Sequence, residues 1–209
     1  MDIQVRKLEK EDSLSQVSRL IYETDNFIFP HFFGHNVTLA KQILTCMIDK
    51  DTIYNRENIY VALVDEQIVG ISVIAPSPVS INLGAFFEAF ECAGATEEID
   101  DAFQSVMKEY FIPMESHPDG YYIACLCVDE QYRGKGIASA MIGQILASHY
   151  GESDVYLDCL TDNQAAISVY ESHGFERLFE FSGFTSMPYY KMIKRAPKIE
   201  MPEESESEN

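Results

Sequence analysis

Positive charge is scarce in this chain. Its 209 residues include 15 lysines and arginines against 34 aspartates and glutamates, which gives a formal net charge of −19. Five of the glutamates lie in residues 200–209, which carry too little apolar surface to fold, and the rest of the chain still has a charge of about −14. A field of this sign repels nucleic acids and anionic membranes, so we expect no nucleic-acid and no membrane partner. The composition leaves open whether the acidity attracts a cationic substrate or only aids solubility.

Long apolar runs and an apolar N-terminal segment are also missing. No run is long enough to span a bilayer, and the chain begins Met-Asp-Ile-Gln-Val-Arg without the apolar region of a secretion signal. The five cysteines are odd in number and lack metal-ligand spacing. We therefore expect a cytoplasmic protein of a reducing compartment, with no metal and no disulfide framework. Cys125 and Cys127 alternate with Leu126 and are expected to be buried in a strand.

Apolar periodicity predicts strands and helices along the whole chain. Strands are expected near residues 3–8, 58–64, 69–75, 122–128, 153–160, 175–181 and 189–194. Helices are expected near residues 12–22, 37–49, 86–92, 97–111, 137–150 and 163–173, the first of them capped by Asp12 or Ser13. The second and third strands, joined by Asp65-Glu66-Gln67, form a predicted hairpin, as do the last two strands.

This order of elements predicts an α/β fold with a mixed, mostly antiparallel central sheet flanked by helices. The two central strands, near residues 122–128 and 155–160, should be parallel because a helix connects them. We expect one domain over residues 1–196, with a helical insertion at about 79–111, followed by a disordered acidic tail at 197–209.

A glycine pair marks the turn between the first central strand and the helix after it. This turn reads Gln131-Tyr132-Arg133-Gly134-Lys135-Gly136-Ile137-Ala138. Such a turn leaves backbone N–H groups bare at a helix N-terminus, where the helix dipole also favours an anion such as phosphate. The alternative is a turn that serves packing alone. A dinucleotide fingerprint is excluded because Ser139 stands where the third glycine belongs, and the frame of a phosphate-binding P-loop is absent.

A second segment follows, with polar and aromatic residues on one helix face. Asn163, Ala166 and Tyr170 are spaced by three and four residues, and Gly174 is a suitable helix stop before Phe175. Together the two segments resemble the GCN5-related N-acetyltransferase (GNAT) family. That family has Gln/Arg-x-x-Gly-x-Gly/Ala at the first site, matched by Gln131, Gly134 and Gly136, and Asn-x-x-Ala-x-x-x-Tyr-x-x-x-Gly-Phe at the second. Glu130 departs from the proline that many members carry.

The resemblance implies that the two parallel strands splay apart and that acetyl-CoA, as co-substrate, enters the gap. Backbone groups of Leu126, Cys127 and Val128 would hold the pantetheine arm. The pyrophosphate would be held by the turn residues Arg133, Gly134, Lys135, Gly136, Ile137, Ala138 and Ser139. Asn163 and its helix would line the other wall, unless Asn163 serves only as the first residue of that helix.

The resemblance further implies direct attack of an amine on the thioester. Tyr170 is the predicted acid for the departing thiolate, and its alternative role is packing of the helix on the sheet. The first central strand lacks the glutamate that some members use as base. The other candidates, none of which stands out, are His31, His35, Glu88, Glu91 and His117.

The acceptor would lie between residues 27–36 and 182–190, both rich in aromatic side chains, with Phe86, Phe87 and Phe90 of the insertion nearby. Aromatic faces beside carboxylates suit a cationic molecule, although the same aromatics also suit a core. We therefore predict an acetyl-CoA-dependent N-acetyltransferase acting on a primary amine of a small cationic molecule. The alternatives are a protein lysine or N-terminal acetyltransferase and a non-catalytic acyl-CoA sensor. A monomer and a homodimer are both compatible with the sequence.

Overall fold

The computed structural model describes residues 1–24, 29–30, 36–80, 82–95, 118–182 and 186–197. Within these residues a seven-stranded sheet has the order β1-β2-β3-β4-β5-β7-β6. Its strands are β1 (Gln4–Lys7), β2 (Ile59–Val64), β3 (Gln67–Ser77), β4 (Gly120–Val128), β5 (Val155–Leu160), β6 (Glu176–Ser182) and β7 (Pro188–Lys194). The helices are α1 (Leu14–Tyr22), α3 (Val37–Met47), α4 (Leu83–Cys92), α6 (Ile137–Ala147) and α7 (Gln164–Ser172).

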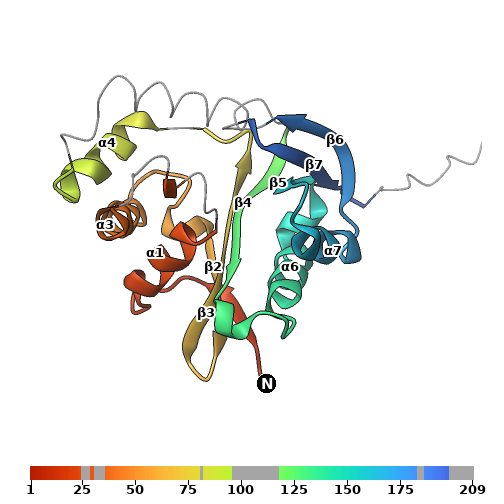
Figure 1. Cartoon of the computed structure of the whole chain (residues 1–209), viewed down its shortest axis with the longest axis horizontal. Helices are drawn as coiled ribbons and strands as arrows, with labels where there is room; N and C mark the ends of the chain where they lie inside the picture. Colours follow the sequence, from red (N-terminus) through yellow and green to blue (C-terminus); the bar gives the residue numbers. More distant parts are fainter. Residues whose placement is uncertain (25–28, 31–35, 81, 96–117, 183–185, 198–209) are drawn as a thin grey trace, which may run out of the picture.

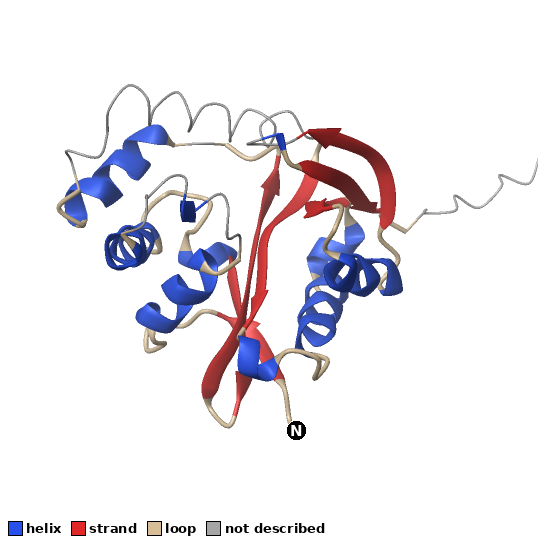
Figure 2. Ribbon diagram, in the orientation of Figure 1, coloured by secondary structure: helices blue, strands red, loops and turns tan. Residues whose placement is uncertain are grey.

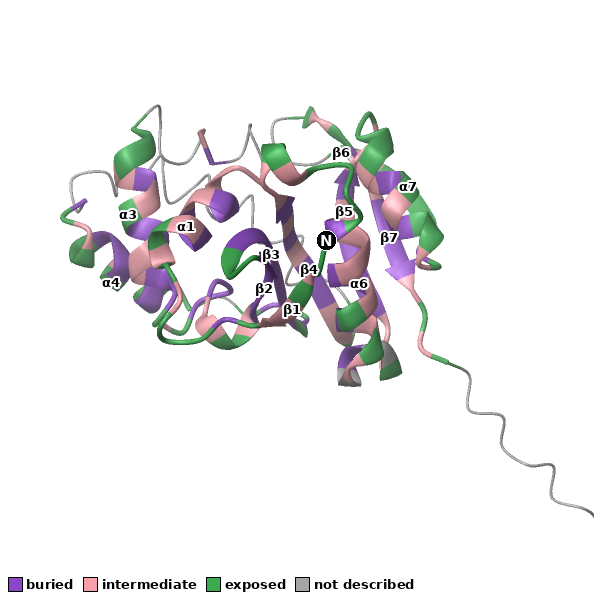
Figure 3. Ribbon diagram, turned by 90° about the horizontal axis from the view of Figure 1, so that it is seen from below, coloured by how far each residue is buried: buried purple, intermediate pink, exposed green. Residues whose placement is uncertain are grey.

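The helices form two layers, one on each face of the sheet (Figures 1 and 2). Helices α1, α3 and α4 cover one face, and α6 and α7 cover the other. Each layer buries its apolar side against the strands and exposes the opposite side (Figure 3). The predicted mixed sheet with flanking helices is therefore confirmed. In the part of the chain described above, no helix is long and apolar enough to cross a membrane.

Most strand pairs are antiparallel, and β4 and β5 form the parallel pair predicted from their helical connection. The predicted hairpin of β2 and β3 turns through Asp65 and Glu66, both with positive φ, at 48° and 63°. This is the backbone that a two-residue turn between twisted strands requires. At the other end of the sheet, β7 lies between β5 and the edge strand β6.

The parallel pairing of β4 and β5 is short. It joins Tyr121, Tyr122 and Ile123 to Val155, Tyr156 and Leu157, and both strands continue beyond it. Opposite β3 the register shifts so that Ala124 is passed over, which is a β-bulge at the place where β4 leaves β5. The predicted splay of the two central strands is thus present, and beyond Ile123 the edge of β4 that faces β5 is not paired with it.

The expectation that no disulfide forms is wrong. Cys46 of α3 and Cys92 of α4 are joined by a disulfide across a sequence separation of 46 residues. No sequence motif links the two cysteines, and the packing of α3 against α4 is what brings them together. Cys125 and Cys127 are buried and are not disulfide-bonded, as predicted.

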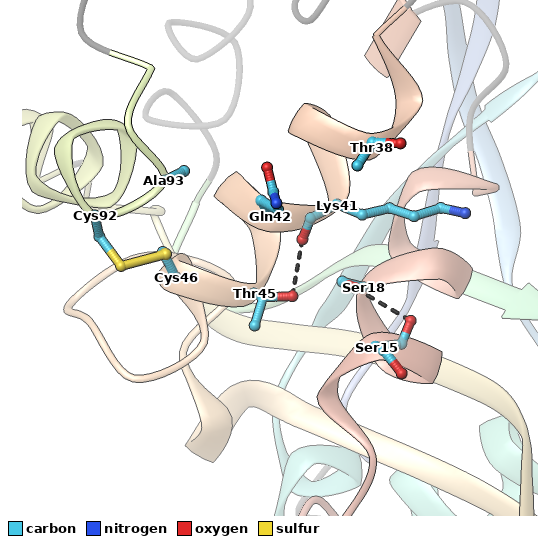
Figure 4. Close-up of a pocket in the computed structure, with 9 residues that line it drawn as sticks. All are labelled: Ser15, Ser18, Thr38, Lys41, Gln42, Thr45, Cys46, Cys92 and Ala93. Carbon is cyan, nitrogen blue, oxygen red and sulfur yellow. Dashed lines mark hydrogen bonds between the residues drawn. A yellow bond between two sulfur atoms is a disulfide. The ribbon is translucent and has the colours of Figure 1, made fainter.

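A cavity of about 430 Å³ lies beside this disulfide, between α1, α3 and α4 (Figure 4). Among its lining groups, Ser18 Oγ donates to the carbonyl of Ser15 at 3.2 Å and Thr45 Oγ1 to that of Lys41 at 2.8 Å. Its lining includes neither the glycine turn nor Tyr170, so it is separate from the candidate active site.

We expect reduction of the disulfide, or the double substitution Cys46→Ser and Cys92→Ser, to lower the free energy of unfolding by roughly 2–4 kcal/mol. The reason is that a cross-link over this separation removes conformational entropy from the unfolded chain. Denaturant unfolding with and without reductant measures the difference, and the double serine variant is the control that should not respond to reductant. An unchanged midpoint in wild-type protein whose thiols titrate as reduced contradicts the prediction.

Two predicted features lie wholly or largely outside the described residues. The expected helix at 97–111 lies wholly outside them, and of the aromatic segment at 27–34 only Phe29 and Pro30 are described. The predicted tail lies outside them from residue 198 on. The division of the chain into one domain, an insertion and a tail therefore stays a prediction.

Candidate active site

The glycine turn opens directly into α6. Gly134 and Gly136 have φ angles of +72° and +80°, which side chains with a Cβ rarely adopt, and a Cβ at either position would meet no atom within 4 Å. The first helical bond runs from Ala140 N to Gly136 O at 2.9 Å. The backbone N–H groups of residues 137–139 lie in the first turn of α6, where no carbonyl of the helix can accept their hydrogen bonds. Gly136 at the cap position has no side chain that could do so. The turn has the open, donor-rich form that an anion requires.

Two cations border this turn and are held by backbone carbonyls. Arg133 Nε donates to Val128 O at 3.0 Å, and Lys135 Nζ donates to Gln131 O at 2.8 Å, while both side chains stay exposed. The contact of Arg133 links the end of β4 to the turn.

A carboxylate at the start of the turn is neutralised by a residue that the sequence did not indicate. Arg19 of α1 donates to Asp129 at 2.5 Å, and this hydrogen bond lowers the pKa of Asp129. The same carboxylate accepts from Gln131 N at 3.0 Å, which orders the short 3₁₀ turn that follows β4. Arg19 and Asp129 are 110 residues apart, so no local pattern could reveal the pair.

The thiols of the two splayed strands are buried and protonated at neutral pH. Burial raises the pKa of Cys127 in β4 to about 11, and burial also raises the pKa of Cys159 in β5 to about 11. Neither cysteine is therefore a nucleophile at neutral pH. Leu126 and Val128 are half-buried and pack toward the α6 and α7 layer.

Tyr170 lies in α7, in the apolar layer beneath the gap. Its side chain is buried, and its ring centroid is 5.8 Å from that of Phe175. Burial raises the pKa of Tyr170, and the Cys159 and Cys125 thiols add to the rise, so the phenol is protonated at neutral pH. These two thiols belong to β5 and β4, which places Tyr170 near both splayed strands.

Asn163 is the first flanking residue of α7, and its side chain accepts from Ala166 N at 3.2 Å. This is the helix-capping role that was its alternative. It lies just past the end of β5, at the same edge of the sheet as the glycine turn. A contact between Asn163 and the coenzyme stays a prediction.

A buried polar cluster at the start of the splay was missed by the sequence analysis. Asp158 of β5 forms an ion pair with Lys191 of β7, at 2.6 Å between Oδ1 and Nζ, and accepts from Tyr122 Oη of β4 at 3.1 Å on Oδ2. The lysine ammonium also lies 5.7 Å from the centre of the Tyr122 ring. The sequence signal for this cluster was an aspartate inside an otherwise apolar strand. A charge that is buried in a sheet requires a partner, so such an aspartate indicates an ion pair.

The carboxylates of α4 are not brought to this gap. Glu88 is exposed and pairs with Lys50 at 3.1 Å, and Glu91 is exposed. Helix α4 packs on α3 at the far side of its layer (Figure 1). Phe86 and Phe90 are core residues, which is the alternative that the sequence left open for them. His31, His35 and His117 lie outside the described residues.

No cluster of metal-ligating side chains occurs among the residues with described positions. Three structural features of a candidate site border the gap between β4 and β5. These are a β4 edge that is not paired with β5, an open donor-rich turn at a helix N-terminus, and a protonated phenol near both strands.

Comparison with known proteins agrees with this geometry. The profile of the acetyltransferase (GNAT) family matches residues 21–175. The N-alpha-acetyltransferase RimI of Mycobacterium tuberculosis is 38% identical over 61 residues, which are 29% of this chain and 38% of RimI. The matched segments span between 17% and 43% of the length of the curated relatives.

Solved structures share the fold at low identity. An N-acetyltransferase of Staphylococcus aureus Mu50 has a TM-score of 0.65 at 19% identity, covering 91% of this chain and all of its own. Arabidopsis thaliana Naa50, in complex with the bisubstrate analogue CoA-Ac-MVNAL, has a TM-score of 0.54 at 16% identity, covering 93% of this chain and 99% of its own. From the family profile, which spans most of the sequence, the chain belongs to the acetyltransferase (GNAT) family.

Proposed function

We propose that this protein is an N-acetyltransferase that moves the acetyl group of acetyl-CoA to a primary amine of a small cationic molecule, by direct attack in a ternary complex. The observation that carries this proposal is the short pairing of β4 with β5, which ends at Ile123 and Leu157. Beyond it, the open edge of β4 leads straight to the bare N-terminus of α6. An extended chain that ends in phosphates fits such a path, because strand edges and helix N-termini supply the complementary donors.

In this proposal the backbone of Leu126, Cys127 and Val128 binds the pantetheine arm as an added strand would bind. The N–H groups of residues 134–139 bind the pyrophosphate, with Arg133 and Lys135 as nearby cations. Asn163 borders the opposite wall. Acetyl-CoA supplies the activated acyl group, and a backbone N–H near Cys127 or Val128 polarises its carbonyl.

Tyr170 donates a proton to the departing sulfur. A thiol has a pKa of about 8.5 in water and a phenol about 10, so the transfer is unfavourable in solution. Burial raises the pKa of Cys127 and of Cys159, in the two strands that border the gap, to about 11, and it raises the pKa of Tyr170 as well, so burial alone does not reverse this balance. The phenol instead stabilises the thiolate by a hydrogen bond as its charge develops, and the proton moves to sulfur as the carbon–sulfur bond breaks.

The acceptor is assigned as cationic from the charge of the chain. A net charge of −19 concentrates cationic molecules near the surface. An alkylamine carries its positive charge at neutral pH, and the field therefore favours its approach.

A second candidate acceptor is the N-terminus of a protein. RimI is described as an N-alpha-acetyltransferase, and the analogue bound to Naa50 carries a peptide portion. A protein acceptor requires a long, open groove. The sequence predicted that the insertion at 79–111 walls the site, but its described helix α4 packs on α3 at the far side of the layer. A non-catalytic sensor is disfavoured because Tyr170 is retained beside the gap.

A screen of amines with purified protein and acetyl-CoA, read as thiol release, tests the proposal. We expect turnover with cationic alkylamines or polyamines, and a fall in kcat/KM as salt rises, because the Debye length drops from ~10 Å at 0.1 M to ~3 Å at 1 M. Removal of the chain after Lys198 is the control and should leave kcat/KM unchanged. Preference for a peptide N-terminus supports the second candidate, and a neutral or anionic best acceptor with salt-independent kcat/KM shows that the charge serves solubility.

A further inference from the structure

We propose that Asp158 accepts the proton that the acceptor amine loses before it attacks, and that Lys191 and Tyr122 position the Asp158 carboxylate. This inference rests on the proposed amine acetylation and identifies the base that the sequence left unassigned. It is carried by where Asp158 lies relative to the splay and to Tyr170.

Asp158 is the first residue of β5 beyond its pairing with β4. The last parallel partners are Ile123 and Leu157, so the side chain of Asp158 emerges where the gap begins. It shares a strand face with Tyr156, two residues earlier, and Tyr156 and Tyr122 both belong to the core on the α1 and α3 side. The carboxylate is therefore on the face of the sheet opposite to α6 and α7.

The proposed acid and base thus lie on opposite faces of the same gap. Tyr170 belongs to the core on the α6 and α7 side, near Cys159, which follows Asp158 in β5 and points to the other face. A thioester between the splayed strands would have the proton donor on one side and the proton acceptor on the other. This arrangement suits direct attack, because the attacking nitrogen and the leaving sulfur are different substituents of the tetrahedral carbon and each can face its own proton carrier.

The surroundings of Asp158 make its carboxylate more basic than an exposed one, yet keep it reachable. Burial raises the pKa of Asp158 and outweighs the opposing effects of Lys191 on β7 and of Tyr122 on β4. Burial likewise lowers the pKa of Lys191, while Asp158 opposes that change. The side chain of Asp158 is 16% exposed, compared with 9% for Lys191, so the carboxylate is the more accessible member of the pair.

A purely structural role does not account for the ion pair of Asp158 with Lys191. Burying two charges costs free energy that their attraction barely recovers, and an apolar pair across β5 and β7 would join these strands as well. The register already aligns Asp158 with Lys191 through the antiparallel ladder. The pair therefore indicates a need for a charge at this position.

The proposed acetyl transfer is balanced in protons and electrons. The ammonium gives one proton to Asp158, and the nitrogen lone pair forms a bond to the acetyl carbon. The carbon–sulfur bond breaks with its electron pair on sulfur, which takes the proton of Tyr170. The new amide nitrogen loses its second proton to solvent, Tyr170 regains one from solvent, and Asp158 releases its own, so one proton leaves per turnover.

The test is Asp158→Asn, which keeps the shape of the side chain and removes its basicity. With an alkylamine at pH 7 we expect kcat/KM to fall by roughly 100-fold or more, as is typical when a general base is lost. The deficit should shrink as pH rises toward the amine pKa of about 10, where free amine is abundant without a base. With hydroxylamine, whose nitrogen is unprotonated at neutral pH, the variant should stay close to wild type.

Asp162→Asn is the matched control, because Asp162 is an exposed carboxylate two residues beyond β5, and it should change kcat/KM less than about twofold. Hydroxylamine turnover and calorimetric binding of acetyl-CoA report that the Asp158→Asn variant is folded. An equal loss with both acceptors, a loss that does not vary with pH, or no loss at all overturns the assignment of the base alone. A wild-type protein that binds acetyl-CoA but acetylates neither acceptor overturns the proposed function, and the base with it.

Discussion

Gly134→Asp is expected to abolish the binding of acetyl-CoA. A carboxylate at this position would occupy the open space outside the turn, where the proposed site holds the pyrophosphate. Two like unit charges 4 Å apart repel by about 4 kcal/mol at an effective dielectric constant of 20, so affinity should fall by more than about 100-fold. Calorimetric titration of purified wild-type and variant protein with acetyl-CoA measures this loss.

Gly94→Asp is a matched control for the backbone strain. Gly94 follows α4, has a φ of +71° against +72° for Gly134, and likewise has no atom within 4 Å of an added Cβ. Both substitutions therefore impose the same conformational cost and the same new charge. Only the Gly134 variant should lose binding, and equal affinities for the two variants would contradict the placement of the pyrophosphate.

Tyr170→Phe is expected to lower kcat by roughly 100-fold and to leave the binding of acetyl-CoA unchanged. The substitution removes only the phenolic oxygen, while the ring keeps its contact with Phe175. Loss of a general acid typically costs a factor of this size or more. Steady-state kinetics with the best amine of the screen, together with a binding titration, separate the two effects.

Tyr150→Phe controls for loss of a buried phenol from the same core. Tyr150 is buried on the α6 and α7 side, packs against Tyr121 at 4.5 Å between ring centroids, and lies away from the proposed chemistry. Its replacement should leave kcat within about twofold. Unchanged turnover in the Tyr170 variant would instead assign Tyr170 to packing.

The sequence alone determined the features that depend on local backbone chemistry. Glycines at 134 and 136 permit the positive φ angles of the turn, and the helix between β4 and β5 requires these strands to be parallel. Alternating burial predicted the strands, and it predicted the buried state of Cys125 and Cys127. Each of these signals lies within a few residues or within one strand–helix–strand unit. They sufficed for the fold and for the glycine turn at the start of α6.

Local signals failed where a residue had a stronger partner elsewhere. Asp12 was expected as a cap of α1, but its carboxylate accepts from Arg6 at 2.7 Å, and Ser13 at the cap position makes no side-chain bond to the helix. Asn163 matched the family motif, yet the interaction that the structure describes is the cap of α7. A short polar side chain has several possible partners, and its neighbours in the sequence do not rank them.

Only the tertiary structure decided the disulfide of Cys46 with Cys92, the neutralisation of Asp129 by Arg19, and the cluster around Asp158. In each case the partners come from elements that are distant in the sequence and adjacent only after the layers pack on the sheet. A pair energy depends on distance, burial and the angle of approach, and none of these is encoded by spacing along the chain. The sequence therefore determined which chemical groups this protein has at its glycine turn, whereas the packing of β4, β5 and β7 decided which side chains surround Asp158.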